Sequence, residues 1–195
     1  LTDSEVLSLA GDFEGNIWFG GGMRGGLSRY DGHHFEQYNL GLPIPAPNRI
    51  GALFVDLNGF LWAGFIVGEG LGVGGLMRIN PQVVSDSTDF ARVQYKMEDG
   101  LVDDEVLSVM QDRDGKVWIG TGGGVSQFDG QVFQNLYRSD GLAHQEARDL
   151  LQDRHGNIWI ASERGVTRYR PLKNTFAVRL KKVVADRTYD PKEAL

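Results

Sequence analysis

The sequence predicts an all-β fold, a β-propeller made of four-stranded antiparallel blades, and three observations lead to it. The chain of 195 residues contains four tryptophans, and each one ends the same motif, Asp-x-x-Gly-x-(Ile/Leu/Val)-Trp. Trp18, Trp62, Trp118 and Trp159 follow one another at intervals of 44, 56 and 41 residues, which are repeat lengths typical of propeller blades. The glycine of each motif supplies the positive φ that a hairpin turn needs, so strands are favoured over helices.

The first strand of each repeat is expected directly before the motif. The segments VLSLAGD, IGALFVD, VLSVMQD and ARDLLQD begin at Val6, Ile50, Val106 and Ala147. Short and largely apolar runs that are bounded by turn residues are typical of strands buried on both faces. The second strand then carries the tryptophan of the motif.

A third strand is expected after a pair formed by glycine and an apolar residue, and it runs through LSRYD, LMRIN, VSQFD or VTRYR. The fourth strand has the weakest signal and is expected at residues 35–38, 93–95, 133–137 and 176–180. A single four-stranded sheet cannot bury both of its apolar faces, so the repeats must stack on one another. The large tryptophan side chain is the expected wedge between neighbouring blades.

The repeats divide the chain into blades. The expected boundaries are residues 1–45 for blade 1, 46–101 for blade 2 with its insertions, 102–142 for blade 3, 143–186 for blade 4, and 187–195 for a linker or the start of a truncated helix. The helix is suggested by the sequence DPKEAL, in which Asp190 stands as the N-cap and proline follows at the first helical position.

Composition excludes several classes of protein. Hydrophobic residues make up 41% of the chain and charged residues 24%, which is typical of a globular domain. The net charge of −6 and the lack of a basic stretch argue against nucleic acid as a partner. No apolar run is long enough to span a bilayer, so no membrane contact is expected from this segment. The chain has no cysteine, which removes disulfides and zinc-thiolate sites.

The repeated aspartates could be read as a functional set, but turn formation explains them better, because Asp accepts hydrogen bonds from the N–H groups that follow it in a turn. One carboxylate per blade also places these groups too far apart for an acid and base pair. Twelve motif residues are therefore expected to be structural: Asp12, Gly15, Trp18, Asp56, Gly59, Trp62, Asp112, Gly115, Trp118, Asp153, Gly156 and Trp159.

The repeat is interrupted most clearly by the glycine-rich segment GEGLGVGGL, which begins at Gly68. A dinucleotide fingerprint would need a strand before it and a helix after it, whereas this segment connects two antiparallel strands. It lengthens the loop between the second and third strands of blade 2 to twice its length in blades 3 and 4. Long loops on a rigid scaffold are common places for binding residues, although a tolerated insertion is the alternative.

The histidines lack the spacing that would place two imidazoles on one metal ion, so no metal or cofactor is expected. Ligands of propellers generally bind at the end formed by the loops between second and third strands and by the connections between blades. A ligand there, such as a sugar or an acidic oligosaccharide, would meet residues of mixed charge, for which an ordinary solvated rim is the alternative. The candidate ligand-binding residues are Arg24, Arg49, Glu69, Asp103, Asp104, His144, Gln145, Arg148, Glu163 and Arg164.

The repeat resembles the two-component regulator propeller repeat. Blade 3 shows the likeness best, from Val106 through VWIGTGGGVSQFDGQVF to Asp140-Gly141-Leu142. Blade 2 departs from the pattern because no Asp-Gly follows its third strand, and blade 4 has Arg170-Pro171 there. In that family such repeats build sensor domains of bacterial hybrid two-component histidine kinases, which are usually periplasmic and often respond to carbohydrates.

The resemblance implies a non-catalytic, ligand-sensing segment of a bacterial signalling receptor, located in the periplasm or otherwise outside the cytoplasm. Its expected partners are a small molecule or oligosaccharide and the rest of the parent receptor. The four blades are expected to belong to a larger array, with a closed ring or a ring completed by self-association as alternatives. An interaction or assembly scaffold is the alternative function, and a propeller lyase or glycosidase is the third.

Overall fold

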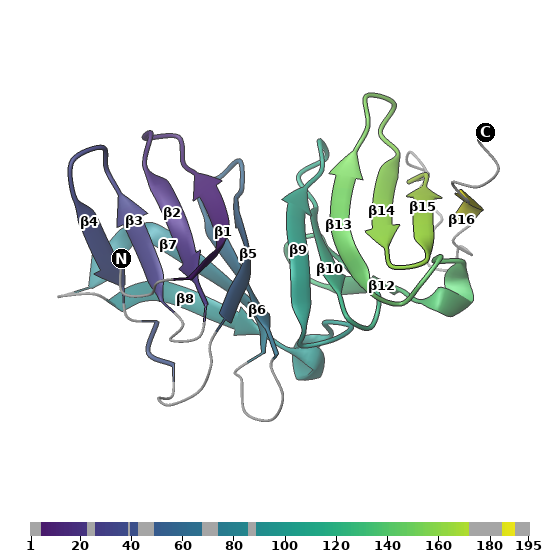
Figure 1. The fold of residues 1–195 in the computed structure, drawn as a ribbon, viewed down its shortest axis with the longest axis horizontal. Helices are drawn as coiled ribbons and strands as arrows, with labels where there is room; N and C mark the ends of the chain where they lie inside the picture. The colour runs from purple at the N-terminus through teal and green to yellow at the C-terminus, as the bar shows by residue number, and fades with distance from the viewer. Residues whose placement is uncertain are drawn as a thin grey trace.

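The computed structural model describes residues 5–22, 26–38, 40–42, 49–67, 74–85, 89–171 and 185–189, and it shows four antiparallel sheets of four strands each (Figure 1). Each sheet is one run of consecutive strands paired in chain order. This arrangement confirms the predicted propeller architecture. The first strand of each blade begins within one residue of the expected position. Each of these strands ends directly before the Asp turn that bounds its apolar run.

Blade 1 consists of β1 (Val6–Gly11), β2 (Ile17–Gly21), β3 (Leu27–Tyr30) and β4 (Phe35–Tyr38). Blade 2 consists of β5 (Arg49–Val55), β6 (Leu61–Ile66), β7 (Gly75–Ser85) and β8 (Asp89–Tyr95). Blade 3 consists of β9 (Val106–Gln111), β10 (Val117–Thr121), β11 (Val125–Phe128) and β12 (Phe133–Leu136). Blade 4 consists of β13 (Ala147–Gln152), β14 (Ile158–Ser162), β15 (Gly165–Tyr169) and β16 (Ala185–Tyr189).

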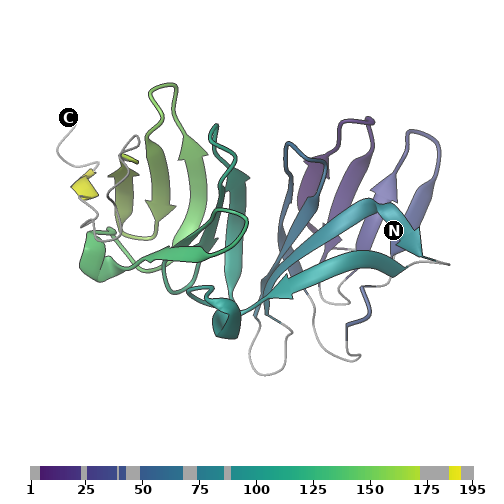
Figure 2. The same cartoon turned by 180° about the vertical axis from the view of Figure 1, so that it is seen from behind.

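Two fourth strands differ from the sequence-based expectation. In blade 2, β7 continues past the expected end at Asn80, and β8 begins before the expected residues 93–95, so that the two strands pair over a greater length with a register shift between Asn80 and Val84 (Figure 2). In blade 4, β16 pairs with β15 and extends to Tyr189, beyond the expected blade boundary at residue 186. The expected strand at 176–180 and the expected helix from Asp190 lie outside the described residues.

The blades fan out from a row of inner strands. Contacts join β1 to β5, β5 to β9 and β9 to β13. Blade 1 and blade 4 stand at opposite ends of the long axis, so the described residues form an open arc (Figure 1). Two short 3-10 turns, η1 (Met97–Asp99) and η2 (Arg138–Asp140), lie in the connections that lead out of blades 2 and 3.

The hydrophobic core is divided into three clusters, and each cluster fills one junction between blades. Trp18 and Leu27 of blade 1 pack with Ile50 and Leu61 of blade 2. Trp62 packs in the same way against blade 3, and Trp118 against blade 4. Each of these indoles therefore faces the blade that follows it, and all three are buried.

The Asp turns fasten each tryptophan to its own hairpin. In blade 3 the carboxylate of Asp112 accepts the backbone N–H groups of Asp114 and Lys116 through Oδ1, and the indole Nε1–H of Trp118 through Oδ2. The Asp Oδ2 to Trp Nε1 distances in blades 1 to 4 are 2.9, 2.8, 2.7 and 2.9 Å. The motif therefore has the expected structural role in the turn. The same carboxylate also accepts the hydrogen bond of the tryptophan indole, which the sequence analysis did not predict.

Candidate functional site

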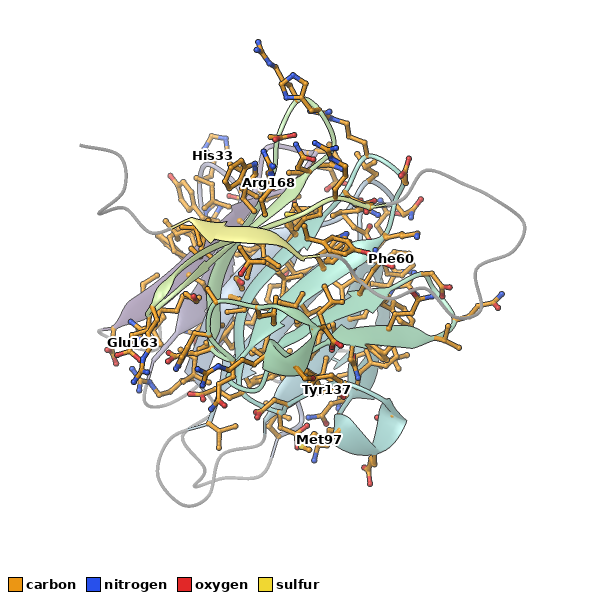
Figure 3. The ribbon with its side chains drawn as sticks, turned by 90° about the vertical axis from the view of Figure 1, so that its right-hand side faces the viewer. His33, Phe60, Met97, Tyr137, Glu163 and Arg168 are labelled. Atoms are coloured by element: carbon orange, nitrogen blue, oxygen red, sulfur yellow. The ribbon has the colours of Figure 1, made fainter. Side chains whose placement is uncertain are left out.

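The two ends of the molecule are built from different loops. Figure 3 shows His33 and Phe60 at one end, which carries the hairpin turns between first and second and between third and fourth strands. Met97, Tyr137 and Glu163 lie toward the other end (Figure 3). That second end, called the connection end below, contains the connections between blades and the turns between second and third strands.

At the connection end of blades 1 and 3, the turn after the second strand packs onto the connection that enters the same blade. The N–H of Gly122 donates to the carbonyl of Glu105 at 3.0 Å, and the N–H of Gly22 donates to the carbonyl of Glu5 at 2.9 Å. A Cβ on Gly122 would lie 2.7 Å from the Glu105 carboxylate, so glycine permits this close approach. The side chains of both loop classes are thereby brought to one surface.

A β-bulge occurs near this end in every first strand. The register with the second strand skips one residue in each blade, namely Leu7, Gly51, Leu107 and Arg148. Bulges re-aim the extra side chain and are frequent beside functional sites. In blade 4 the re-aimed side chain is a guanidinium, and Arg148 Nε contacts Glu146 Oε1 at 2.9 Å.

His144, Glu146 and Glu163 bring potential ligand atoms together at the connection end. One potential ligand atom from each lies within 4.8 Å of the others. His144 and Glu146 come from the connection into β13, and Glu163 from the turn between β14 and β15. His144 Nδ1 already accepts the Glu146 N–H at 3.3 Å, and Glu146 already pairs with Arg148. These partners suit the group better to hydrogen-bonding a polar ligand than to enclosing a metal ion, which needs lone pairs free of competing donors.

Three carboxylates, of Asp103, Glu105 and Glu146, interact on the same surface. The pKa of Glu105 is raised, first by burial and then by the nearby carboxylates of Asp103 and Glu146. Like charges that lie close together disfavour the ionised form of each other. Because Glu105 and Glu146 occupy the same repeat position, immediately before β9 and β13, this acidic region spans blades 3 and 4.

The structure places the other candidate residues as follows. Arg49, at the start of β5, lies 3.9 Å from Glu5. Asp103 and Asp104 accept backbone N–H groups, from Glu105 at 2.8 Å and from Met97 at 2.8 Å, so both help to shape the connection. Gln145, Arg148 and Arg164 are exposed. Arg24 and Glu69, together with most of the glycine-rich segment from Gly68, lie outside the described residues.

Sequence reasoning missed Glu105 and Glu146. Both stand one residue before the apolar run of a first strand, in the position that Glu5 and Arg49 hold in blades 1 and 2. An alignment of the repeats on that position would have shown three glutamates and one arginine at one end of the inner strands. The approach of Glu163 could not have been read from the sequence, since it depends on the β14–β15 turn folding back over the connection.

A small hollow lies between blades 1 and 2 among Asp12, Trp18, Arg29 and Pro81, with a volume of about 50 Å³. Ligand pockets for drug-sized molecules are typically ~300–1,000 Å³. This hollow therefore suits one or two water molecules and is too small for a sugar ring.

Comparison with known families then accounts for the repeat. A family model described as the two component regulator propeller matches residues 100–123 and 141–164. These segments include the first two strands of blade 3 and of blade 4. Two repeats of the chain match the two-component regulator propeller model. This match confirms the resemblance expected from the repeat motif.

Solved structures show the same fold. The extracellular domains of two putative hybrid two-component systems from B. thetaiotaomicron align with TM-scores of 0.68 and 0.66 at 17% and 18% identity, over 96% and 88% of this chain. The chain spans only 27% and 23% of their lengths. Virginiamycin B lyase from Staphylococcus aureus aligns with a TM-score of 0.64 at 12% identity, over 86% of this chain and 53% of the lyase. At these identities the likeness establishes the propeller fold.

The search of curated proteins gave no match. Among the residues that the structure describes, no helix has the length and apolar character needed to cross a bilayer.

Proposed function

We propose that this chain is a non-catalytic, ligand-sensing propeller segment of a bacterial two-component signalling receptor. The repeats of blades 3 and 4 support the assignment to such receptors, because the family model matches these two blades. The extracellular position of the structurally similar domains supports a location outside the cytoplasm. The remainder of a parent receptor is the proposed signalling partner.

The ligand is proposed to bind at the connection end of blades 3 and 4. The observation that carries this proposal is the convergence of His144, Glu146 and Glu163 within 4.8 Å, beside the re-aimed Arg148. Carboxylates accept hydrogen bonds, a guanidinium donates them, and imidazole can do either. A sugar presents several hydroxyls that each donate and accept, so this set matches a carbohydrate.

The charge at the site favours a neutral sugar over the acidic oligosaccharide considered from the sequence. Burial first, and then the neighbouring carboxylates of Asp103 and Glu146, raise the pKa of Glu105. A ligand with its own carboxylates would add to this repulsion. Hydroxyl groups carry no charge and can donate to the same oxygens.

Calorimetric titration of a panel of neutral and acidic oligosaccharides tests the proposal. The wild-type chain should bind at least one neutral glycan, and Glu146→Gln should weaken that binding about tenfold or more, because hydrogen bonds to a charged group contribute ~1.5–3 kcal/mol. His33→Ala, at the opposite end of the molecule, is the matched control and should bind as the wild type does. Binding that is unchanged in Glu146→Gln, or that is confined to acidic glycans, would contradict the proposed site.

A further inference from the structure

The connections that enter blades 3 and 4 are anchored at the same point. The backbone N–H of Val102 donates to the Ser126 hydroxyl at 3.0 Å, and the N–H of Ala143 donates to the Thr167 hydroxyl at 2.8 Å. The two donors hold the same repeat position in their connections. Both acceptors lie in a third strand, β11 or β15, and both are buried, with exposed fractions of 0% and 1%. A buried hydroxyl of each blade therefore ties down the chain that leads into it.

The residue after each anchored N–H caps the glutamate that follows. Asp103 Oδ1 accepts the N–H of Glu105 at 2.8 Å, and His144 Nδ1 accepts the N–H of Glu146 at 3.3 Å. Because Nδ1 is the acceptor, the neutral imidazole of His144 carries its proton on Nε2. Blades 3 and 4 thus repeat one arrangement, in which an anchored N–H is followed by a capping side chain and then by a glutamate.

In blade 4 the anchor is adjacent to the side chains of the proposed ligand site. Ala143 directly precedes His144, which lies with Glu146 and Glu163 in the group whose potential ligand atoms are within 4.8 Å of one another. The anchoring strand, β15, is also the strand that follows the turn bearing Glu163. One hydroxyl therefore ties the connection to the strand that leads out of that turn. Support of this kind fixes the relative positions of side chains that must meet one ligand.

The cores of the blades do not require a hydroxyl at this third-strand position. In every blade the residue there pairs with the residue after the tryptophan, and it is Ser28, Met77, Ser126 or Thr167. Met77 is 1% exposed, so an apolar side chain also fills the space. The hydroxyls of blades 3 and 4 are therefore explained by the connections that they anchor. The matching connection residues of blades 1 and 2 lie outside the described residues.

We propose that Thr167 and Ser126 are positioning residues for the ligand site at the connection end. Both side chains are buried, so they act through the backbone that carries His144 and Asp103 and do not touch the ligand. Without the Thr167 hydroxyl, the Ala143 N–H would lose its acceptor, and the connection would no longer be tied to β15. The effect on ligand binding rests on the function proposed above, whereas the anchoring of the backbone does not.

Nuclear magnetic resonance of the free protein tests the anchoring without a ligand. Thr167→Val keeps the shape of the side chain and removes the acceptor, whereas Thr167→Ser keeps the acceptor and removes a methyl group. In Thr167→Val the ring nitrogen resonances of His144 should shift toward a mixture of the two tautomers, and the Ala143 amide should exchange with solvent about tenfold faster, because one hydrogen bond is lost. Thr167→Ser should leave both close to the wild type. Ser126→Ala, the matched control in blade 3, should leave the His144 ring in its wild-type tautomer and instead accelerate exchange at Val102.

Calorimetric titration with the same panel of neutral oligosaccharides tests the consequence for binding. Thr167→Val should weaken the binding of a neutral glycan about tenfold, and Thr167→Ser should weaken it by less than about twofold, because only the first variant loses the hydrogen bond. Wild-type affinity in Thr167→Val, despite shifted His144 resonances, would overturn the positioning role.

The two measurements separate this proposal from the proposed function. His144 resonances that Thr167→Val leaves unchanged, or that Thr167→Ser disturbs equally, would overturn the proposal whether or not a glycan binds. The expected resonance shifts in a protein whose wild type binds no glycan would overturn the proposed function and leave the anchoring role intact. Should Thr167→Val fail to fold, Ser126→Ala carries the same test, since faster exchange of the Val102 amide is required there and unchanged exchange would overturn the proposal.

Discussion

The two ends of this propeller are constrained to different degrees. At the end that carries the Asp turns, all four blades repeat one hydrogen-bonded arrangement, in which a carboxylate accepts two turn N–H groups and the indole of its own tryptophan. At the connection end, the corresponding positions hold Glu5, Arg49, Glu105 and Glu146. The difference separates the scaffold from the proposed site: the repeated end fastens each tryptophan to its own hairpin, and the variable end gives each blade its own polar surface.

The largest effect should follow from removing a tryptophan that the repeated end holds in place. Trp118→Ala should lower the free energy of unfolding by about 3–5 kcal/mol, because it leaves a large cavity between blades 3 and 4. Trp159→Ala should cost clearly less, since its indole is partly exposed. Denaturant unfolding of both variants measures the contrast, and equal losses would contradict the difference in burial between the two indoles.

The next effect should come from the carboxylate itself. Asp112→Ala removes the acceptor of the buried Trp118 indole and of two turn N–H groups, so it should destabilise the chain by about 2–3 kcal/mol. Asp114→Ala, two residues further on and exposed in the same turn, serves as the control and should change stability by less than about 0.5 kcal/mol. If thermal unfolding showed the same loss of stability for both variants, the stabilising role of the Asp112 carboxylate would be refuted.

Acid should weaken the repeated end. Hydrogen bonds from Asn157 and Trp159 hold the pKa of Asp153 well below its ordinary value, against the opposing effect of desolvation. Desolvation also raises the pKa of Asp12, but bonds from Asn16 and Trp18 outweigh it and lower the pKa overall.

Because these carboxylates have a lower pKa when folded, their contribution to stability is fully present above the unfolded value of 3.8 and is lost as pH falls toward the folded value. Unfolding measured between about pH 5 and pH 2 should show this loss, and Asp153→Asn should reduce its steepness. If Asp153→Asn lost stability with falling pH as steeply as the wild type, Asp153 would be excluded as a source of the pH dependence.

The smallest effect on stability is expected at the connection end. Glu163→Gln should change the unfolding free energy by less than about 0.5 kcal/mol, because the side chain is exposed and relieving repulsion among carboxylates offsets the lost charge. If Glu163→Gln destabilised the chain as much as Asp112→Ala does, the distinction between a stabilising Asp-turn end and a proposed binding end would be contradicted.

The fold was predictable because its signals are local and repeated. The Asp and Gly of each motif determine a hairpin whatever surrounds them, so Trp62 and Trp118 indicated their strands correctly. The link from Asp112 to Trp118 was missed because two residues six positions apart meet only once the hairpin is closed. β16 was misplaced because the fourth strand has no motif and is defined only by its pairing with β15.

The candidate site was predicted less completely for a related reason. His144 could be placed at the connection end from its position between blades. Glu163 was also a candidate, but its approach to His144 depends on the turn between β14 and β15, and Glu146 was not among the candidates.

The one tryptophan per blade also gives the protein a built-in optical readout. Indole emission shifts to longer wavelength with exposure to water, and the three buried rings differ in this respect from the partly exposed Trp159. Soluble quenchers should therefore reach Trp159 first. Any event that covers the outer surface of blade 4 would register as a blue shift and as protection from quenching, without a label attached to the chain.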